Sequence, residues 1–130
     1  MIKQLSILAF GLLILSAIGC KKENTVTITF EEPTNEATVS DPKDVHIHID
    51  VTSDDEFDVF RVTLENETTE KTIAPLNPFE KHVHGKTYEF EQEMDLSSYP
   101  SGTEFHLEVE ICKDHDCKEI VKTEAIHFKI

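Results

Sequence analysis

The feature that most constrains the fold is a strict alternation of apolar and polar side chains in several short runs. Between Val45 and Thr52, Val and Ile alternate with His, Asp and Thr, and a similar run spans Phe105 to Ile111. A period of two residues places the apolar side chains of an extended strand on one face. No stretch after residue 20 sustains the spacing of an amphipathic helix. The sequence therefore predicts an all-β domain.

Shorter runs of the same kind complete the pattern. Together the runs predict seven strands, which favour a seven-stranded immunoglobulin-like two-sheet sandwich over residues 26–130. A small barrel or a jelly-roll fragment is the alternative. The further predicted strands are Val26–Phe30, Phe60–Leu64, Lys71–Ala74, Tyr88–Met94 and Glu119–Ile130.

Two segments are predicted to interrupt the strands. Ser53–Glu56 is rich in turn residues, so the chain is expected to reverse direction there. Val59, which follows this turn, is expected to face outward. Pro75–Gly85 contains two prolines and is expected to be the longest irregular stretch of the domain.

The first 20 residues have the pattern of a bacterial lipoprotein signal peptide. Lys3 precedes an apolar segment from Leu5 to Ile18, and Gly19 precedes Cys20. This segment is shorter than the roughly 20 apolar residues of a transmembrane helix. We therefore expect residues 1–19 to be a signal peptide and residues 20–25 to be a lipidated Cys20 with its tether. An ordinary secretory signal is the alternative.

The charge balance limits the possible partners. The chain has 12 Lys and Arg residues against 26 Asp and Glu residues, a formal net charge of −14. Nucleic-acid binding depends on Lys and Arg that replace counterions at phosphates, so a nucleic-acid partner is not expected. Contact with a membrane is expected only through the lipid on Cys20, with the outer membrane of the cell envelope as the expected location.

Two cysteines remain after Cys20 is assigned to lipid. Cys112 and Cys117 lie five residues apart at a predicted hairpin. Disulfides form and persist in exported proteins, so these cysteines are predicted to form one. Free thiols or soft metal ligands are the alternative.

Two His-x-His pairs are the candidate metal ligands. His46 and His48 lie on one strand face with Cα atoms about 6–7 Å apart, and His82 and His84 form a second pair. Two imidazoles with a carboxylate such as Asp50 suit Zn²⁺ or Cu²⁺. An antiparallel pairing of the two strands sets the pairs roughly 15 Å apart. The favoured interpretation is solvated histidines and no cofactor; zinc or copper binding and proton sensing are the alternatives.

Other chemistry has less support in the sequence. Acidic turns around Asp54 or between Asp114 and Asp116 offer oxygen ligands for Ca²⁺, but neither has EF-hand spacing. No Gly-x-Ser-x-Gly motif occurs, and no cysteine is left free as a nucleophile. We therefore do not expect an enzyme.

The chain resembles an uncharacterised family of Bacteroidota lipoproteins that have an immunoglobulin-like or fibronectin type III-like domain. The resemblance is carried by the Gly-Cys-Lys-Lys-Glu opening, Val45–Asp50, His82–Gly85 and Leu96–Phe105. It implies a sandwich fold and a lipid-anchored location. The expected function is a non-catalytic binding or structural module of the envelope that recognises a protein or glycan through sheet faces and end loops. A metal-binding lipoprotein that uses the His-x-His pairs is the alternative.

Overall fold

Seven β-strands form the regular structure of residues 25–130, the part of the chain that the computed structural model describes. No helix occurs within these residues, and hence none that is long and apolar enough to cross a membrane. The prediction of an all-β domain is confirmed. The strands are β1 (Val26–Glu32), β2 (Ala37–Thr38), β3 (Val45–Asn66), β4 (Lys71–Thr72), β5 (Phe79–Met94), β6 (Glu104–Cys112) and β7 (Ile120–Lys129).

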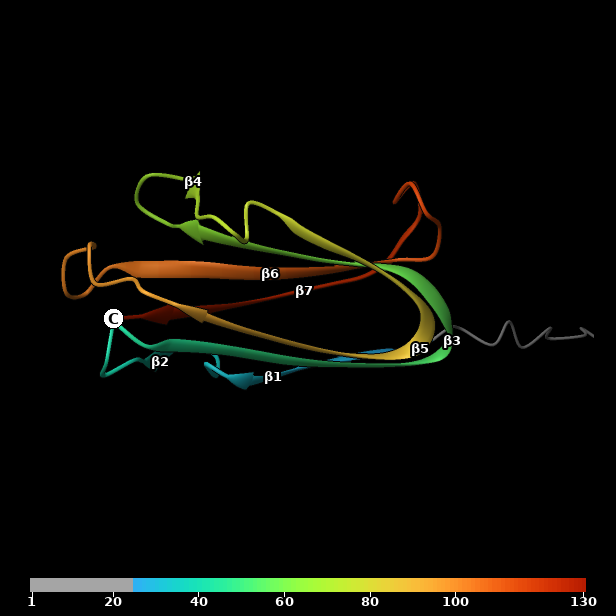
Figure 1. Ribbon diagram of the computed structural model, residues 1–130, viewed down its shortest axis with the longest axis horizontal. Coiled ribbons are helices and arrows are strands. Elements are labelled where there is room, and N and C mark those ends of the chain that lie inside the picture. The colour runs from blue at the N-terminus through green and yellow to red at the C-terminus, as the bar shows by residue number, and fades with distance from the viewer. Residues whose placement is uncertain (1–24) are drawn as a thin grey trace, which may run out of the picture.

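Two long strands, β3 and β5, run side by side through both layers of the molecule and bend together at one end (Figure 1). The first half of β3 pairs with β1 and with the second half of β5. Its second half pairs with the first half of β5 and with β6. One sheet therefore folds over on itself, and its two layers are covalently continuous through β3 and β5.

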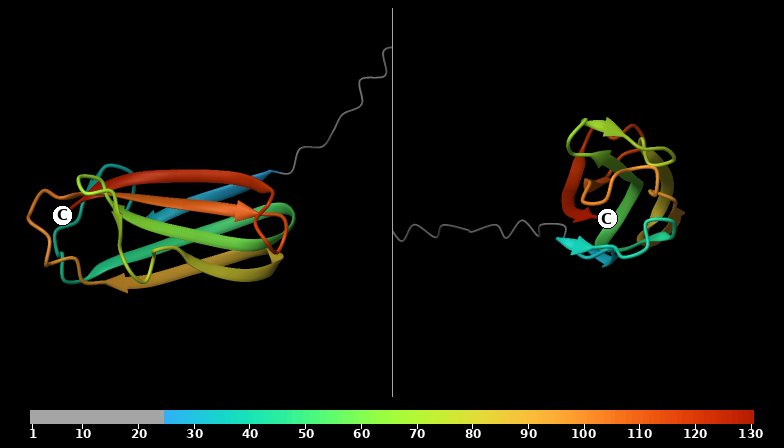
Figure 2. Two further views of the ribbon diagram at one scale, coloured as in Figure 1. Left: turned by 90° about the horizontal axis from the view of Figure 1, so that it is seen from above. Right: turned by 90° about the vertical axis from the view of Figure 1, so that its left-hand side faces the viewer.

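The remaining strands extend the sheet away from β3. β6 pairs antiparallel with β7, and the short β2 pairs parallel with β7, while β4 adds a two-residue pairing at the end of β3. The sheet order is β1-β3-β6-β7-β2, with β5 on the other side of β3. Figure 2 shows the strands wrapped around a common interior. The immunoglobulin-like arrangement stays a prediction.

The chain reverses direction at Ser53–Glu56, as predicted, but it does so inside β3 and not in a turn between two strands (Figure 1). The chain bends there without leaving the sheet. The pairing register with β5 shifts between Thr52 and Phe57, and again between Phe57 and Val59. Such irregularities bend a strand and re-aim its side chains. They also explain why Val59, predicted to face outward, is only 1% exposed.

The predicted irregular stretch Pro75–Gly85 is shorter than expected. β5 begins at Phe79, directly after Pro78, and it includes His82 and His84. Proline cannot donate to a strand ladder, so the two prolines precede the strand and do not interrupt it. Gly85 pairs with Phe57 where the two long strands bend.

The apolar faces of both layers enclose one core. The alternating positions of β3 and β6 are almost fully buried, as the sequence predicts. Burial of a Val, Leu, Ile or Phe side chain stabilises the fold by about 1.5–3 kcal/mol. Phe57 at the bend and Leu76 before β5 are buried residues outside the predicted apolar faces, and both pack into this core.

Candidate metal centre

The outward side of β3 carries the first predicted histidine pair. Because alternate side chains of this strand face the core, His46, His48 and Asp50 face outward together. β5 runs antiparallel beside this stretch, with His48 opposite Glu91 and Asp50 opposite Glu89. The register between the two strands therefore brings carboxylates from β5 to the predicted histidines.

His48, Asp50 and Glu89 form a compact group on this face. One possible ligand atom from each residue lies within 4.8 Å of the other two. His48 Nε2 is 3.1 Å from Glu89 Oε1 and 3.4 Å from Asp50 Oδ1. These three donors are one imidazole nitrogen and two carboxylate oxygens, a set that binds Zn²⁺.

The Nε2 atom of His48 lacks a hydrogen bond. It is shielded from solvent, and neither carboxylate accepts from it with hydrogen-bond geometry. Buried polar atoms almost always have a partner, and each exception needs an explanation. A cation held between this nitrogen and the oxygens of Asp50 and Glu89 would supply the missing partner.

His46 does not join this group. Its Nδ1 donates to Glu32 Oε2 at 3.0 Å, and Glu32 lies at the end of β1. The hydrogen bond to Glu32 raises the pKa of His46, with smaller contributions from the charges of Glu32, Glu91 and Glu93. The two rings lie 6.1 Å apart. The closest carboxylate therefore differs between the two rings, although Glu91 Oε1 lies 3.8 Å from His46 Nε2 and 3.9 Å from His48 Nδ1.

The paired outward positions of β3 and β5 around His48 contain no Lys or Arg. Thr52 lies opposite Thr87, and three further pairs combine a His or Asp with a Glu: His46–Glu93, His48–Glu91 and Asp50–Glu89. Neighbouring carboxylates repel each other unless a proton or cation lies near them. This face is therefore suited to a cation.

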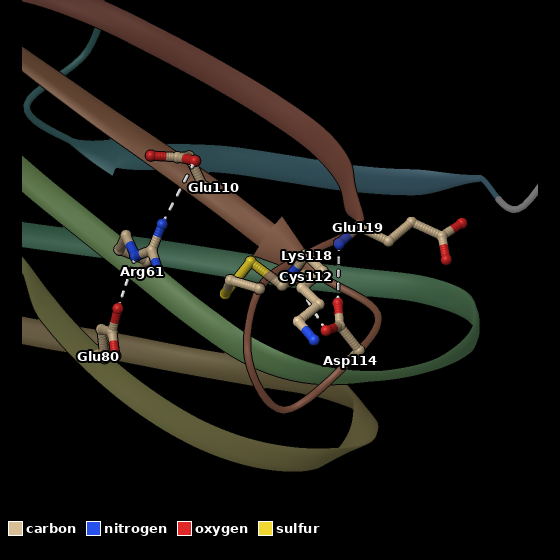
Figure 3. Close-up of a disulfide and its surroundings, with 8 residues drawn as sticks. Arg61, Glu80, Glu110, Cys112, Asp114, Lys118 and Glu119 are labelled. Carbon is tan, nitrogen blue, oxygen red and sulfur yellow. Dashed lines mark hydrogen bonds and ion pairs between the residues drawn. A yellow bond between two sulfur atoms is a disulfide. The ribbon is translucent and has the colours of Figure 1, made fainter.

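On the opposite layer, an arginine lies between two carboxylates. Arg61 projects from the second half of β3 between Glu80 on β5 and Glu110 on β6 (Figure 3). Its Nε donates to Glu80 Oε1 at 2.7 Å, and one of its terminal nitrogens is 3.7 Å from Glu110. Here the chain supplies an arginine, whereas the paired outward positions around His48 contain no Lys or Arg.

The second predicted pair, His82 and His84, lies near the bend and belongs to a different group. The His82 ring stacks on His115 with centroids 4.3 Å apart, and His84 contacts the carboxylate of Asp58. His115 lies in the loop after β6, so sequence spacing could not have placed it here. His82 and His84 are therefore separate from His46 and His48.

The loop that carries His115 is held at both ends. Cys112 and Cys117 form the predicted disulfide, with Cα atoms 5.0 Å apart. Asp114 accepts hydrogen bonds from the backbone N–H of Lys118 at 3.0 Å and of Glu119 at 2.8 Å (Figure 3). These bonds lower the pKa of Asp114. Since both of its oxygens are engaged, Asp114 is a poor ligand for the Ca²⁺ considered from sequence.

A third group lies on the outward side of the other layer. Glu67, His106 and His127 bring one possible ligand atom each within 4.8 Å of the others. Sequence alternation placed His106 outward, but it gave no sign that His127 and Glu67 would join it. These residues come from three segments, so only the pairing of β3, β6 and β7 reveals the group.

The predicted signal peptide, residues 1–19, and the predicted lipidation site, Cys20, lie outside the described residues. No protein-family model matches the chain, and no curated protein is detectably similar to it.

Proposed function

We propose that this chain is a non-catalytic, lipid-anchored binding module of the cell envelope, and that its ligand is a divalent transition metal ion held by His48, Asp50 and Glu89. The single observation that carries the metal is the Nε2 atom of His48, which is shielded from solvent and has no hydrogen bond, although carboxylate oxygens of Asp50 and Glu89 lie close to it. The location rests on the sequence pattern that ends at Cys20, and on the resemblance to Bacteroidota lipoproteins.

The donor set favours Zn²⁺ over the hard cations. Imidazole suits Zn²⁺, Cu²⁺ and Ni²⁺, whereas Ca²⁺ and Mg²⁺ prefer oxygen ligands throughout. Three protein donors leave a fourth position of tetrahedral zinc for water or for a group from another molecule. Asp50 and Glu89 would also be relieved of their mutual repulsion. A domain of this kind would hold or pass on metal close to the membrane surface.

Calorimetric titration of the full chain with Zn²⁺ tests the proposal. The chain is purified in non-ionic detergent with a tag that contains no histidine, and Mg²⁺ serves as the control cation. Changing a residue that only orients a ligand lowers metal affinity by about 10–100-fold. His48 and Asp50 are proposed as direct ligands, so His48→Gln and Asp50→Asn are each expected to weaken the binding of one zinc ion per chain by at least about tenfold.

His46→Gln is the matched control, because His46 lies on the same face but outside the group. It is expected to leave zinc affinity unchanged. Equal zinc binding by His48→Gln and by the unmodified chain would overturn the assignment. A loss caused by His46→Gln as large as that caused by His48→Gln would instead restore the simple His-x-His chelate that the sequence predicts.

Recognition of a protein or glycan partner is the second candidate function. It is favoured by the loop between β6 and β7, which the disulfide and Asp114 hold in one shape. Ile120 follows this loop and is 47% exposed, unlike the other large apolar side chains of the described residues. A rigid loop beside an exposed apolar side chain is a suitable contact surface.

Cross-linking of envelope fractions to the full chain tests this second candidate. Ile120→Ser is expected to reduce recovery of any specific partner, while Ile73→Ser, a change away from this loop, is not. Equal recovery with both variants would count against recognition through the β6–β7 loop.

A further inference from the structure

We infer that Glu67, His106 and His127 form a second divalent-metal site, on the opposite layer from His48. The inference extends the proposed function but stands on different residues. Its donor set is two imidazoles and one carboxylate, which has more nitrogen than the set at His48. Zn²⁺ is bound by such a set in proteins, with a fourth position left open.

The two histidines lie directly opposite each other on neighbouring strands. His106 of β6 pairs with His127 of β7 in the antiparallel register, and their rings lie 4.9 Å apart. Side chains at opposite positions of such a pair have Cβ atoms about 4.5–5.5 Å apart. Two imidazoles at this separation can bind one metal ion after small side-chain rotations.

Glu67 is brought to the histidines by the turn that follows β3. The buried side chain of Asn66 accepts hydrogen bonds from the backbone N–H of Thr68 at 3.0 Å and of Thr69 at 3.4 Å. The N–H of Glu67 itself donates to the carbonyl of Glu104, at the start of β6, at 3.1 Å. The Glu67 carboxylate contacts His127 Nδ1.

The backbone of His127 is fixed from the other side. Its N–H donates to Asn35 Oδ1 at 3.1 Å, and its carbonyl accepts from the N–H of Glu36 at 2.6 Å. The loop before β2 therefore holds β7 at this residue. A metal site needs donors whose positions are set by the surrounding structure. Here backbone hydrogen bonds hold Glu67 and His127 in place. The pairing of β6 with β7 holds His106.

The group is open to solvent, so a metal ion can reach it. Glu67 lines two hollows, of which one is shared with His106 and the other with His127. Glu65, Glu70 and Glu108 also line the first hollow. These carboxylates raise the local concentration of cations. The competing interpretation is a simple ion pair between Glu67 and a protonated His127, with no affinity for metal.

The test uses the full chain in non-ionic detergent at pH 7.5, with ¹⁵N-labelled histidine and Zn²⁺ as the probe. Long-range ¹H–¹⁵N spectra report each imidazole nitrogen separately. We expect added zinc to shift the ring nitrogens of His106 and His127 together, with saturation at one ion per chain for this pair. The same titration with Mg²⁺ provides the reference spectra.

Variants connect the shifts to the proposed donors. Glu67→Gln keeps the size of the side chain and is expected to weaken zinc binding at His106 and His127 by at least about tenfold. Glu31→Gln, on β1 and outside both hollows, is the control and is expected to leave zinc binding at His106 and His127 unchanged. Calorimetry of His106→Gln should show one fewer zinc equivalent than the unmodified chain.

The outcomes at the two sites are distinguishable. If zinc leaves the His106 and His127 signals unmoved in the unmodified chain, the second site is overturned, and the ion-pair interpretation holds. That result would not affect His48, whose signal is read in the same spectra. If the His48 signal is unmoved while those of His106 and His127 shift, the proposed centre fails and the second site stands.

Discussion

His46 and His48 are two residues apart on one face of one strand, yet their closest carboxylates come from different strands. The alternation of the sequence predicts their shared face correctly. It could not predict their partners, because Glu32 and Glu89 come from other strands and are selected by register. The residue-level chemistry of this site therefore depends on information that local sequence does not contain.

Glu32→Gln is expected to lower the pKa of His46 toward its ordinary value near 6.5. The raised pKa means that the His46–Glu32 pair contributes stability below about pH 6.5, and that this contribution is lost as pH rises through the folded-state pKa. Imidazole NMR titration measures the change. Glu108→Gln, on the other layer, is the control and should leave the His46 titration unaltered; an unchanged His46 pKa in Glu32→Gln would contradict the assignment.

Asp114→Ala is expected to loosen the loop after β6, because two backbone amides lose their acceptor. Amide hydrogen exchange at Lys118 and Glu119 should become faster, whereas Asp116→Ala should have little effect on them. Since the pKa of Asp114 is lowered, its contribution is present above about pH 3.9 and disappears as pH falls through the folded-state pKa. Slow exchange retained in Asp114→Ala would exclude this role.

At the scale of elements, β3 and β5 differ most from the sequence prediction. Ser53–Glu56 consists of residues that favour turns, and on local preference alone a reversal was the reasonable expectation. The pairing with β5 continues on both sides of these residues, so the strand bends through register shifts and does not end. The reversal was therefore predictable from local preference, whereas its location inside one continuous strand depends on tertiary pairing.

Phe57 is the core residue nearest the bend, and it is 1% exposed. Phe57→Ala is expected to lower the free energy of unfolding by about 3–5 kcal/mol, because it leaves a cavity where the layers meet. Denaturant unfolding followed by circular dichroism gives the value. Ile120→Ala, at an exposed position, should change stability by no more than about 0.5 kcal/mol. If Phe57→Ala lowers the free energy of unfolding by an equally small amount, the bend does not depend on the Phe57 ring.

The disulfide is a local element of stability. In the chain-entropy model, a ring as short as that closed by Cys112 and Cys117 contributes roughly 2 kcal/mol. Replacing both cysteines by Ala should lower the free energy of unfolding by about this amount. Chemical reduction of the unmodified chain is the parallel measurement. If neither treatment changes the unfolding midpoint, the disulfide has no stabilising role.

At the scale of the molecule, the sequence predicted the all-β class and most of the buried faces. Those predictions follow from alternation, which is a local property. The course of β3 through both layers and the grouping of seven histidines into small clusters follow from long-range pairing. The excess of acidic residues is visible in the composition, but the grouping of carboxylates around His48 is not.

Zinc at about one hundred times its dissociation constant is expected to stabilise the folded chain by about 2.7 kcal/mol for each site. Metal ligands must be deprotonated, so this stabilisation should fall as pH decreases below about 6.5, the ordinary pKa of histidine. Thermal unfolding with zinc, with chelator and with Mg²⁺ measures it between pH 5 and pH 8. A zinc effect that is constant across this range would exclude histidine as a ligand.

The edge position of β1 has a mechanical consequence. Among the described residues, β1 takes its ladder bonds from β3 alone, and it is the strand that follows the proposed tether. Tension between a membrane and the domain would therefore reach β1 before any other strand. Detachment of β1 would remove Glu32 from His46, but His48, Asp50 and Glu89 would stay together because β3 and β5 hold them. A pull on the N-terminal end of the domain is therefore expected to detach β1 and to leave the proposed metal ligands together.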